Sequence, residues 1–286
     1  MKKYKIKAFC KINLSLRVLK RLNNNYHSIS SFVTFCDIHD LIQIRRINRL
    51  KDKVVFSGNF RKGIDLKHNT ITKTLDLLRV KNLLGENFFE IEVKKNIPQG
   101  SGLGGGSSNA AALLNFFNIK NFLQIKKNEI YKIAKNVGSD VPVCLEYKNT
   151  LLTDYPDKMK RTNKKLKLIM LIVYPNIKSS TKKIYQKNKQ FSEKVNKFNI
   201  FKDNKKIINF FINEKNDLEK TVIKLYPEVS NLLQLISKQK GCYFSRITGS
   251  GSACLGIFFN KKTAIYTRNL IKLKFPKYWC VVSKTI

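Results

Sequence analysis

The chain has 286 residues, of which 43% are hydrophobic, and this composition excludes an intrinsically disordered protein. A chain of this length favours about two domains. The 56 Lys and Arg residues outnumber the 19 Asp and Glu residues, for a formal net charge of +37. This charge is typical of proteins with an anionic partner, either nucleotides or nucleic acid. Because the lysines are spread along the whole chain without an arginine-rich patch, we favour compositional drift, with some help in attracting anionic substrates.

The cysteines, histidines and apolar runs indicate where the protein works. Six cysteines are scattered without a Cys-x-x-Cys pair, and the three histidines show no metal-ligand spacing. Cysteines used in this way are typical of a reducing cytoplasm. The longest apolar run, residues 168–174, is too short to span a bilayer, and the N-terminal segment lacks the apolar core of a signal peptide. We therefore expect a soluble cytoplasmic protein without a membrane partner.

In chain order, the first half of the sequence combines strand and helix patterns. Alternation of apolar and polar residues predicts strands at residues 4–18 (as a strand pair), 29–36, 40–47 and 88–94. A polar turn is expected at residues 20–25. Apolar residues at helical spacing predict helices at residues 70–80 and 127–136.

The pattern changes after about residue 151, so we expect an N-terminal domain of residues 1–155 and a C-terminal domain of residues 156–286. Strand patterns follow at residues 167–174, 243–247, 253–259 and 278–282. Helical patterns follow at residues 180–191, 207–212, 227–239 and 261–273. The Lys-rich and Asn-rich part of the chain between residues 187 and 220 has an arrangement that the pattern leaves open.

Residues 98–108 form a glycine-rich stretch that holds five of the 13 glycines of the chain. A predicted strand precedes it, and a helical pattern over residues 109–118 follows it, with Ser107 or Ser108 as the expected N-cap. Glycine leaves backbone N–H groups open to a ligand, and a helix N-terminus adds unpaired donors and partial positive charge. The order of strand, glycine loop and helix therefore predicts a phosphate-binding loop rather than a flexible linker.

Two common phosphate loops do not account for this stretch. A Walker loop needs Gly-Lys-Ser or Gly-Lys-Thr at its end, and no lysine follows these glycines. A Rossmann fingerprint matches literally at Gly100, Gly102 and Gly105, but it needs an acidic residue at the end of the next strand. Residues 121–128, where that acid is expected, offer none on a strand.

Two further motifs hold groups that could carry chemistry. Lys11 and Asn13 lie two positions apart on a predicted strand and therefore share one face, with their apolar neighbours toward the core. Asp140 lies in a Gly-Ser-Asp-Val-Pro corner between a helix and an apolar strand, where glycine and proline hold its carboxylate in place. There it could accept a proton from an attacking hydroxyl or orient it. The alternatives are a solvated edge lysine and a turn or N-cap aspartate.

A second loop of small residues and an aromatic pair allow two interpretations each. Residues 248–254 carry hydroxyls beside their glycines. A hairpin turn explains the glycines, and close approach to a phosphate explains the hydroxyls as well. Tyr26 and His27 are either ordinary surface or core aromatics, or residues that stack on a base and hydrogen-bond its edge.

The order of these motifs, more than any one of them, carries a resemblance to a known family. Five motifs follow one another along the chain: Lys-x-Asn, Tyr-His, the glycine-rich stretch followed by Ser-Ser-Asn-Ala-Ala, Gly-x-Asp-Val-Pro and Gly-Ser-Gly-Ser-Ala. This series resembles the GHMP kinases, from about residue 8 to residue 258. The triple glycine and the Tyr-His pair resemble, within them, the branch that acts on a cytidyl diphosphate substrate.

The resemblance implies a kinase that uses ATP to phosphorylate the 2-hydroxyl of 4-diphosphocytidyl-2-C-methyl-D-erythritol, in the non-mevalonate isoprenoid pathway. Asp140 is implied as the base, with Lys11 holding it ionised and stabilising charge on the transferring phosphoryl group. ATP binding is implied for Pro98, Gln99, Gly100, Ser101, Gly102, Leu103, Gly104, Gly105, Gly106, Ser107, Ser108 and Asn69. Substrate binding is implied for Asn13, Tyr26, His27, Tyr185, Gly249, Ser250 and Gly251. Ser108 is the implied Mg²⁺ ligand, and metal contact through water and phosphate alone is the alternative.

The implied fold class is α/β (α+β), the two-domain GHMP kinase fold. Its N-terminal domain resembles a ribosomal protein and contains a left-handed β-α-β crossover, a rare exception to the usual handedness. Its C-terminal domain is an α/β sandwich. Two other functions stay open, another small-molecule GHMP kinase such as a homoserine kinase, and a basic RNA-binding protein. Nucleic acid is not the expected partner, because the chain has no RNP-like run and no arginine-rich motif.

Overall fold

The computed structural model describes residues 2–23, 26–156, 158–194 and 204–286. Contacts within the chain divide it into two compact units. Unit 1 consists of Met1–Lys11, Ile38–Gln99 and Gly104–Tyr147, and unit 2 consists of Ile12–Asp37, Gly100–Leu103 and Lys148–Ile286. These units are defined by contacts and not by order along the chain, so the domain boundary expected after residue 155 stays a prediction.

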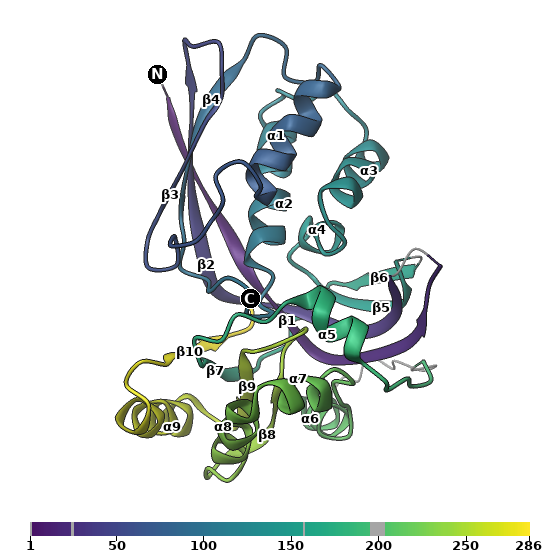
Figure 1. The fold of residues 1–286 in the computed structure, drawn as a ribbon, viewed down its shortest axis with the longest axis vertical. Helices are drawn as coiled ribbons and strands as arrows, with labels where there is room; N and C mark the ends of the chain where they lie inside the picture. Colours follow the sequence, from purple (N-terminus) through teal and green to yellow (C-terminus); the bar gives the residue numbers. More distant parts are fainter. Residues whose placement is uncertain (1, 24–25, 157, 195–203) are drawn as a thin grey trace. The chain divides into compact units, whose positions relative to one another are not determined.

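Two long strands, β1 (Lys3–Arg21) and β2 (His27–Ile47), run along the first part of the chain and pair with each other (Figure 1). The sequence predicts two strands in place of each, and this division is wrong. Neither segment contains Gly or Pro, the two residues that interrupt a strand most strongly. Each strand therefore continues where the pattern weakens, and each contributes residues to both units.

The strands of unit 1 surround β4 (Phe88–Lys94), which begins and ends where the sequence predicts. β4 pairs antiparallel with the second part of β2 and parallel with β3 (Lys53–Ser57). A parallel pair needs a crossover connection, and here it contains helix α1 (Thr70–Val80). The sequence predicts α1 with the same bounds.

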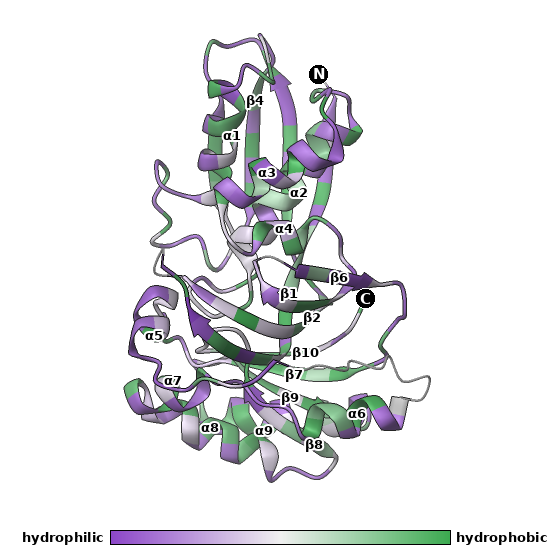
Figure 2. Ribbon diagram, turned by 90° about the vertical axis from the view of Figure 1, so that its right-hand side faces the viewer, coloured by the Kyte–Doolittle hydropathy of each residue, from purple (hydrophilic) through white to green (hydrophobic). Residues whose placement is uncertain are grey.

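The helices of unit 1 cover one face of these strands (Figures 1 and 2). They are α1, α2 (Gly105–Ile119), α3 (Lys127–Val137) and the short α4 (Val141–Cys144). α2 packs against the other three and is almost wholly apolar from Ala110 onward, as expected of a helix at the centre of a layer.

Helix α2 begins at Gly105, earlier than the sequence predicts, and Gly104 is its N-cap. Gly104 has φ +66°, in the left-handed region that glycine enters at little cost, and no side chain caps the helix. The expectation that Ser107 or Ser108 caps α2 is therefore wrong. The N–H of Ser108 already donates to the carbonyl of Gly104 at 2.9 Å, so both serines lie inside the first turn.

Unit 2 contains a four-stranded antiparallel sheet in the order β10-β7-β9-β8. Its strands are β7 (Ile169–Tyr174), β8 (Cys242–Ile247), β9 (Cys254–Phe258) and β10 (Trp279–Lys284). The first part of β2 pairs with β5 (Asn149–Tyr155), which pairs with β6 (Lys158–Thr162). The pairings between these strands are antiparallel, so hairpins and short connections can join them.

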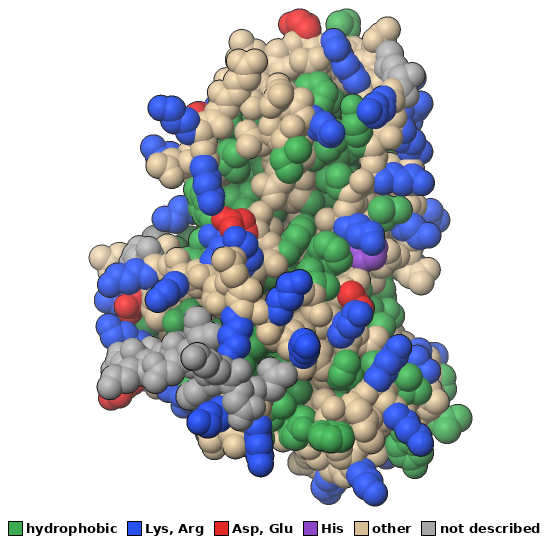
Figure 3. All heavy atoms as spheres, turned by 180° about the vertical axis from the view of Figure 1, so that it is seen from behind, with side chains coloured by type: hydrophobic (Ala, Val, Ile, Leu, Met, Phe, Trp, Pro, Cys, Tyr) green, Lys and Arg blue, Asp and Glu red, His purple; other side chains and the backbone are tan. Residues whose placement is uncertain are grey.

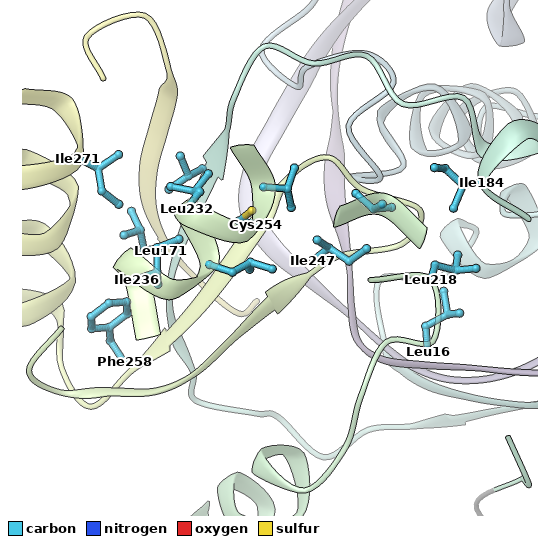
Figure 4. Packing of buried hydrophobic residues seen from close by; sticks show 14 of the residues in the cluster. Leu16, Leu171, Ile184, Leu218, Leu232, Ile236, Ile247, Cys254, Phe258 and Ile271 are labelled. Atoms are coloured by element: carbon cyan, nitrogen blue, oxygen red, sulfur yellow. The ribbon is translucent and has the colours of Figure 1, made fainter. Parts of the chain in front are cut away.

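The core of unit 2 forms where helices α8 (Pro227–Ser237) and α9 (Lys261–Lys274) cover the four-stranded sheet (Figure 2). Leu171, Ile236 and Phe258 lie side by side in this core, and Phe258 is the most exposed of them at 2% (Figure 4). Each fully buried side chain of this kind contributes about 1.5–3 kcal/mol by leaving water. The sheet and its two helices are therefore held together mainly by apolar packing.

The remaining helices of unit 2 are α5 (Thr181–Lys187), α6 (Asn204–Ile212) and α7 (Glu219–Leu225). The sequence misses α7 as well as β3, β5, β6 and α4, because these elements are short and several are polar. Residues 195–203 of the Lys-rich segment lie outside the described residues. Among the residues that are described, no helix combines the length and the apolar character needed to cross a membrane.

Candidate functional site

Lys11 of β1 is buried in unit 1 and forms an ion pair with Asp140. The side chain of Lys11 is 5% exposed, and its Nζ lies 2.7 Å from Oδ2 of Asp140. Burial by itself would lower the pKa of Lys11, but the charge and hydrogen bond of Asp140 outweigh it and raise that pKa. Lys11 is therefore a fixed cation and not a solvated edge residue.

The strand around Lys11 differs from the expected arrangement in one respect. The sequence predicts a core face and an opposite face that carries Lys11 and Asn13. In the structure both faces are buried, since Lys11 is 4% exposed and Asn13 is 2% exposed. Alternation of apolar and polar residues indicates a strand with one buried and one exposed face. A strand that is buried on both faces cannot be recognised as such from alternation.

Asp140 lies between α3 and α4, at the N-cap position of α4. Its side chain makes no capping hydrogen bond, so the alternative of a simple N-cap aspartate is wrong. The carboxylate is 38% exposed and turns toward Lys11. The expected apolar strand after Asp140 is instead the helix α4, whose residues are buried. Asp140 is thus held by a cation on one side and open to a ligand on another.

Gly104 places the glycine-rich stretch directly beside Lys11. A Cβ built at Gly104 would lie 2.9 Å from Cβ of Lys11 and 3.0 Å from its Cε. Both the positive φ and this contact require glycine at position 104. The N-terminus of α2, with its unpaired N–H groups and partial positive charge, therefore lies next to the Lys11–Asp140 pair.

A second buried ion pair lies under the same helix end, and the sequence interpretation missed it. Lys95 is 3% exposed and pairs with Asp40, which is fully buried. The other carboxylate oxygen of Asp40 accepts the N–H groups of Asn96 and Ile97, at 2.7 and 2.9 Å. A Cβ built at Gly105 would lie 3.3 Å from Nζ of Lys95. One indication of this pair was present in the sequence, because Asp40 is a charged residue in the middle of the largely apolar strand β2.

The first part of the glycine-rich stretch belongs to unit 2 and packs against the loop after β8. A Cβ at Gly102 would lie 2.2 Å from the carbonyl oxygen of Thr248, so only glycine fits there. Ser101 accepts a hydrogen bond from the N–H of Ala253 at 3.0 Å. Residues 248–253 also close the hairpin between β8 and β9, since the N–H of Thr248 donates to Ala253 at 3.1 Å. The prediction that residues 248–254 form a hairpin turn is therefore confirmed. The close contact of this turn with residues 100–103 is a second reason why it contains glycine.

Asn13 joins this loop to the strands of unit 2. Its backbone N–H donates to Oγ1 of Thr248 at 2.9 Å, and its Nδ2 donates to Oγ of Ser31 at 2.8 Å. Its Oδ1 is buried and has no hydrogen-bond partner among the residues described. A buried acceptor of this kind costs free energy unless a ligand supplies a donor.

Two of the expected base-binding aromatics, His27 and Tyr185, lie together in unit 2. Their ring centroids are 5.1 Å apart and the rings are tilted by 36°. Partial burial and the charge of Arg21 lower the pKa of His27, so its imidazole is neutral near pH 7 and can both donate and accept. Tyr26 is 60% exposed. The three residues offer ring faces and edges to a planar ligand.

Asn69 and Ser108 already have hydrogen-bond partners within the protein. Oδ1 of Asn69 caps α1 by accepting from the N–H of Thr72 at 2.9 Å, and its Nδ2 donates to Asp65 and Leu66. Ser108 is fully buried and donates to the carbonyl of Phe9 at 2.6 Å. Roles for Asn69 at adenine and for Ser108 at a metal stay predictions. Within the described part of the chain, no three His, Cys, Asp or Glu residues are grouped as a metal site.

Comparison with known proteins identifies the family. The family model described as GHMP kinases N terminal domain matches residues 69–146, and the model described as GHMP kinases C terminal matches residues 201–268. A protein of Pelagibacter ubique (strain HTCC1062) named 4-diphosphocytidyl-2-C-methyl-D-erythritol kinase is 40% identical over 286 residues, 100% of both chains. The chain belongs to this family of GHMP kinases.

Other relatives of the kinase family agree with this membership. A protein of the same name from Anaplasma marginale (strain Florida) is 31% identical, over 98% of this chain and 96% of its own. A crystal structure of 4-(cytidine 5'-diphospho)-2C-methyl-D-erythritol kinase has a TM-score of 0.78 at 20% identity, covering 98% of this chain and 99% of the other. Homoserine kinase from Cytophaga hutchinsonii has a TM-score of 0.70 at 15% identity, covering 100% and 95%. The predicted family and the two-domain GHMP kinase fold are therefore confirmed.

Proposed function

We propose that this kinase transfers the γ-phosphoryl group of ATP to the 2-hydroxyl of 4-diphosphocytidyl-2-C-methyl-D-erythritol. One observation carries the proposal, the 2.7 Å pair of Lys11 and Asp140 beside the N-terminus of α2. It is supported by relatives that bear this name at 40% and 31% identity. A kinase for homoserine is less favoured, because its likeness to this chain is structural and only 15% identical.

In the proposed reaction, Asp140 accepts the proton of the substrate hydroxyl while the oxygen forms a bond to the γ-phosphorus. The bond between that phosphorus and the oxygen of ADP breaks, and ADP leaves. Lys11 stays protonated, keeps Asp140 ionised and stabilises the negative charge on the transferring group. The half-exposed carboxylate of Asp140 meets the requirement that a base reach its substrate.

Two sets of residues are proposed to bind the two substrates. The backbone N–H groups of residues 98–108 bind the phosphates of ATP, at the start of α2. Mg²⁺ neutralises phosphate charge in reactions of this kind, and here we propose that it is held by phosphate and water. His27, Tyr185 and Tyr26 bind the cytosine ring, and the unpartnered Oδ1 of Asn13 accepts a hydrogen bond from the substrate.

A direct assay tests this proposal. The purified chain is incubated with ATP, Mg²⁺ and either the cytidyl diphosphate substrate or homoserine, and both ADP and the phosphorylated product are measured. We expect product from the cytidyl compound only, formed at least ~10²-fold more slowly by a chain carrying Asp140→Asn. Absence of a phosphorylated cytidyl product from the unaltered chain would contradict the proposal.

A reducing cytoplasm is proposed as the place of action, and small molecules rather than nucleic acid as partners. The six cysteines, all of them in the described residues, form no disulfide. On the face drawn in Figure 3, Lys and Arg side chains are scattered and do not gather in one basic patch. A nucleic-acid interface usually has its positive charge on one face or stripe.

A further inference from the structure

Ser108 links the glycine N-cap of α2 to the strand that carries Lys11. Its backbone N–H donates to the carbonyl of Gly104 at 2.9 Å, one helical turn back. Its hydroxyl donates to the carbonyl of Phe9 at 2.6 Å, in β1. Phe9 lies two residues before Lys11, a distance of about 7 Å along a strand. One buried side chain therefore spans from the helix end to the strand that holds the cation.

The contact between Gly104 and Lys11 closes this arrangement into a ring. The Lys11 side chain lies against the Cα of Gly104, since a Cβ there would come within 2.9 Å of it. A helix hydrogen bond joins Gly104 to Ser108, and the side-chain hydrogen bond joins Ser108 to Phe9. The strand β1 connects Phe9 to Lys11, and the packing contact joins Lys11 back to Gly104. A shift of β1 along α2 would break the hydrogen bond of Ser108 and move Lys11 relative to Asp140.

Tyr147 supports the same stretch of β1. Its hydroxyl donates to the carbonyl of Lys7 at 3.2 Å. Its ring packs edge-on against Phe9, with centroids 5.0 Å apart. Burial raises the pKa of Tyr147 to about 12, so the hydroxyl keeps its proton at neutral pH. β1 is therefore held at alternate carbonyls, those of Lys7 and Phe9.

These contacts are unsuited to a metal ligand at Ser108. Mg²⁺ requires near-octahedral oxygen ligands at about 2.0–2.1 Å and usually keeps several waters. Ser108 is 0% exposed, and its hydroxyl proton is committed to the carbonyl of Phe9. We propose that Ser108 is a positioning residue, which sets the register of Lys11 against the glycine loop, and not a ligand of Mg²⁺. This inference deepens the proposed phosphoryl transfer and rests on it for its kinetic consequence.

The first test compares Ser108→Ala with the control Thr74→Val, which removes another buried hydroxyl of unit 1, one that donates to the carbonyl of Thr70 at 2.7 Å within α1. We expect Ser108→Ala to lower kcat by about 10-fold to 100-fold, the cost of a reacting group displaced by about 1 Å. The Mg²⁺ concentration that gives half-maximal rate should stay within twofold of the value for the unaltered chain. The control should change neither value by more than twofold. A raised Mg²⁺ requirement with full kcat at saturating Mg²⁺ would overturn the proposal, and so would unaltered kinetics.

Ser108→Cys gives a second test that nearly keeps the side-chain volume and is therefore expected to fold. A thiolate ligand prefers soft metals, so a metal site at position 108 would shift its preference from Mg²⁺ toward Cd²⁺. We expect the preference for Mg²⁺ to be unchanged. A rate that Cd²⁺ restores and Mg²⁺ does not would overturn the proposal.

A third measurement does not depend on turnover, so it separates this inference from the proposed function. Lys11 is 4% exposed in the folded chain, and amine acetylation followed by mass spectrometry reports its protection. We expect Lys11 to be labelled several-fold faster in Ser108→Ala than in the unaltered chain, and at the unaltered rate in Thr74→Val. Equal labelling in the folded Ser108→Ala chain would overturn the positioning role. Failure of the unaltered chain to phosphorylate the cytidyl compound would instead reject the proposed function alone.

Discussion

Lys11 and Asp140 meet at 2.7 Å although 129 positions separate them along the chain. One comes from a long strand and the other from the corner between two helices. Replacing Asp140 by Asn removes the base, and replacing Lys11 by Ala removes the cation that keeps it ionised. We expect each change to lower kcat at least ~10²-fold, the scale of an acid–base contribution.

Steady-state kinetics with ATP and the cytidyl compound provide the measurement. Lys127→Ala is the matched control, because Lys127 forms an exposed pair with Glu146 at 3.0 Å in the same unit. The control should keep its kcat, since exposed pairs contribute little. Full turnover in Asp140→Asn would exclude Asp140 as the base.

Gly104 allows a test of close packing that is separate from backbone strain. Gly104→Ala forces a side chain into φ +66° and within 2.9 Å of Lys11. Gly85→Ala imposes a similar strain at φ +48°, but a Cβ there meets nothing within 4 Å. Left-handed strain costs roughly 1–2 kcal/mol at either site.

We therefore expect both alanine variants to lose similar stability from strain, with a further loss at Gly104. Only Gly104→Ala should lower kcat, by about 10-fold or more, because it displaces Lys11. Thermal unfolding and turnover are measured on both. Equal activity in the two variants would show that the contact at Lys11 has no catalytic consequence.

The Lys95–Asp40 pair is expected to contribute to stability because both groups are buried. Removing one partner of a buried pair leaves an uncompensated charge and costs about 3–5 kcal/mol. Asp40→Asn should therefore lower the free energy of unfolding by that amount in urea titrations. Glu90→Gln is the comparison, since Arg45 and Lys53, its partners, are half-exposed and such pairs contribute about 0–1 kcal/mol. If Asp40→Asn lost less free energy of unfolding than Glu90→Gln, the buried pair would not be the more stabilising of the two.

His27 is expected to make stability depend on pH. Burial and the charge of Arg21 lower its pKa in the folded chain, so the unfolded chain binds more protons below the unfolded pKa of about 6.5. The contribution is therefore complete above pH ~6.5 and declines as the pH falls toward the folded pKa. Unfolding titrations of the unaltered chain and of His27→Gln measure it. A stability difference between the two that does not change between pH 8 and pH 5 would count against this assignment.

Local pattern was enough for much of the fold and for the family. The bounds of α1 and β4 were predictable because one apolar face and strict alternation are short-range properties. The glycine-rich stretch and the order of the motifs indicated a phosphate site and the GHMP kinases, which the family models confirm. The start of α2 was not predictable, because Gly104 replaces the side-chain cap on which the expectation depended.

The sequence by itself determined which residue types are present and in what order, because motifs and periodicity are written in neighbouring positions. Only the tertiary structure decided which of them meet. Lys11 next to Asp140, Lys95 next to Asp40 and Ser108 next to Phe9 are contacts across long sequence separations. A buried charge or hydroxyl needs a partner, and the fold alone selects that partner, since no local pattern records which distant group fills the remaining space.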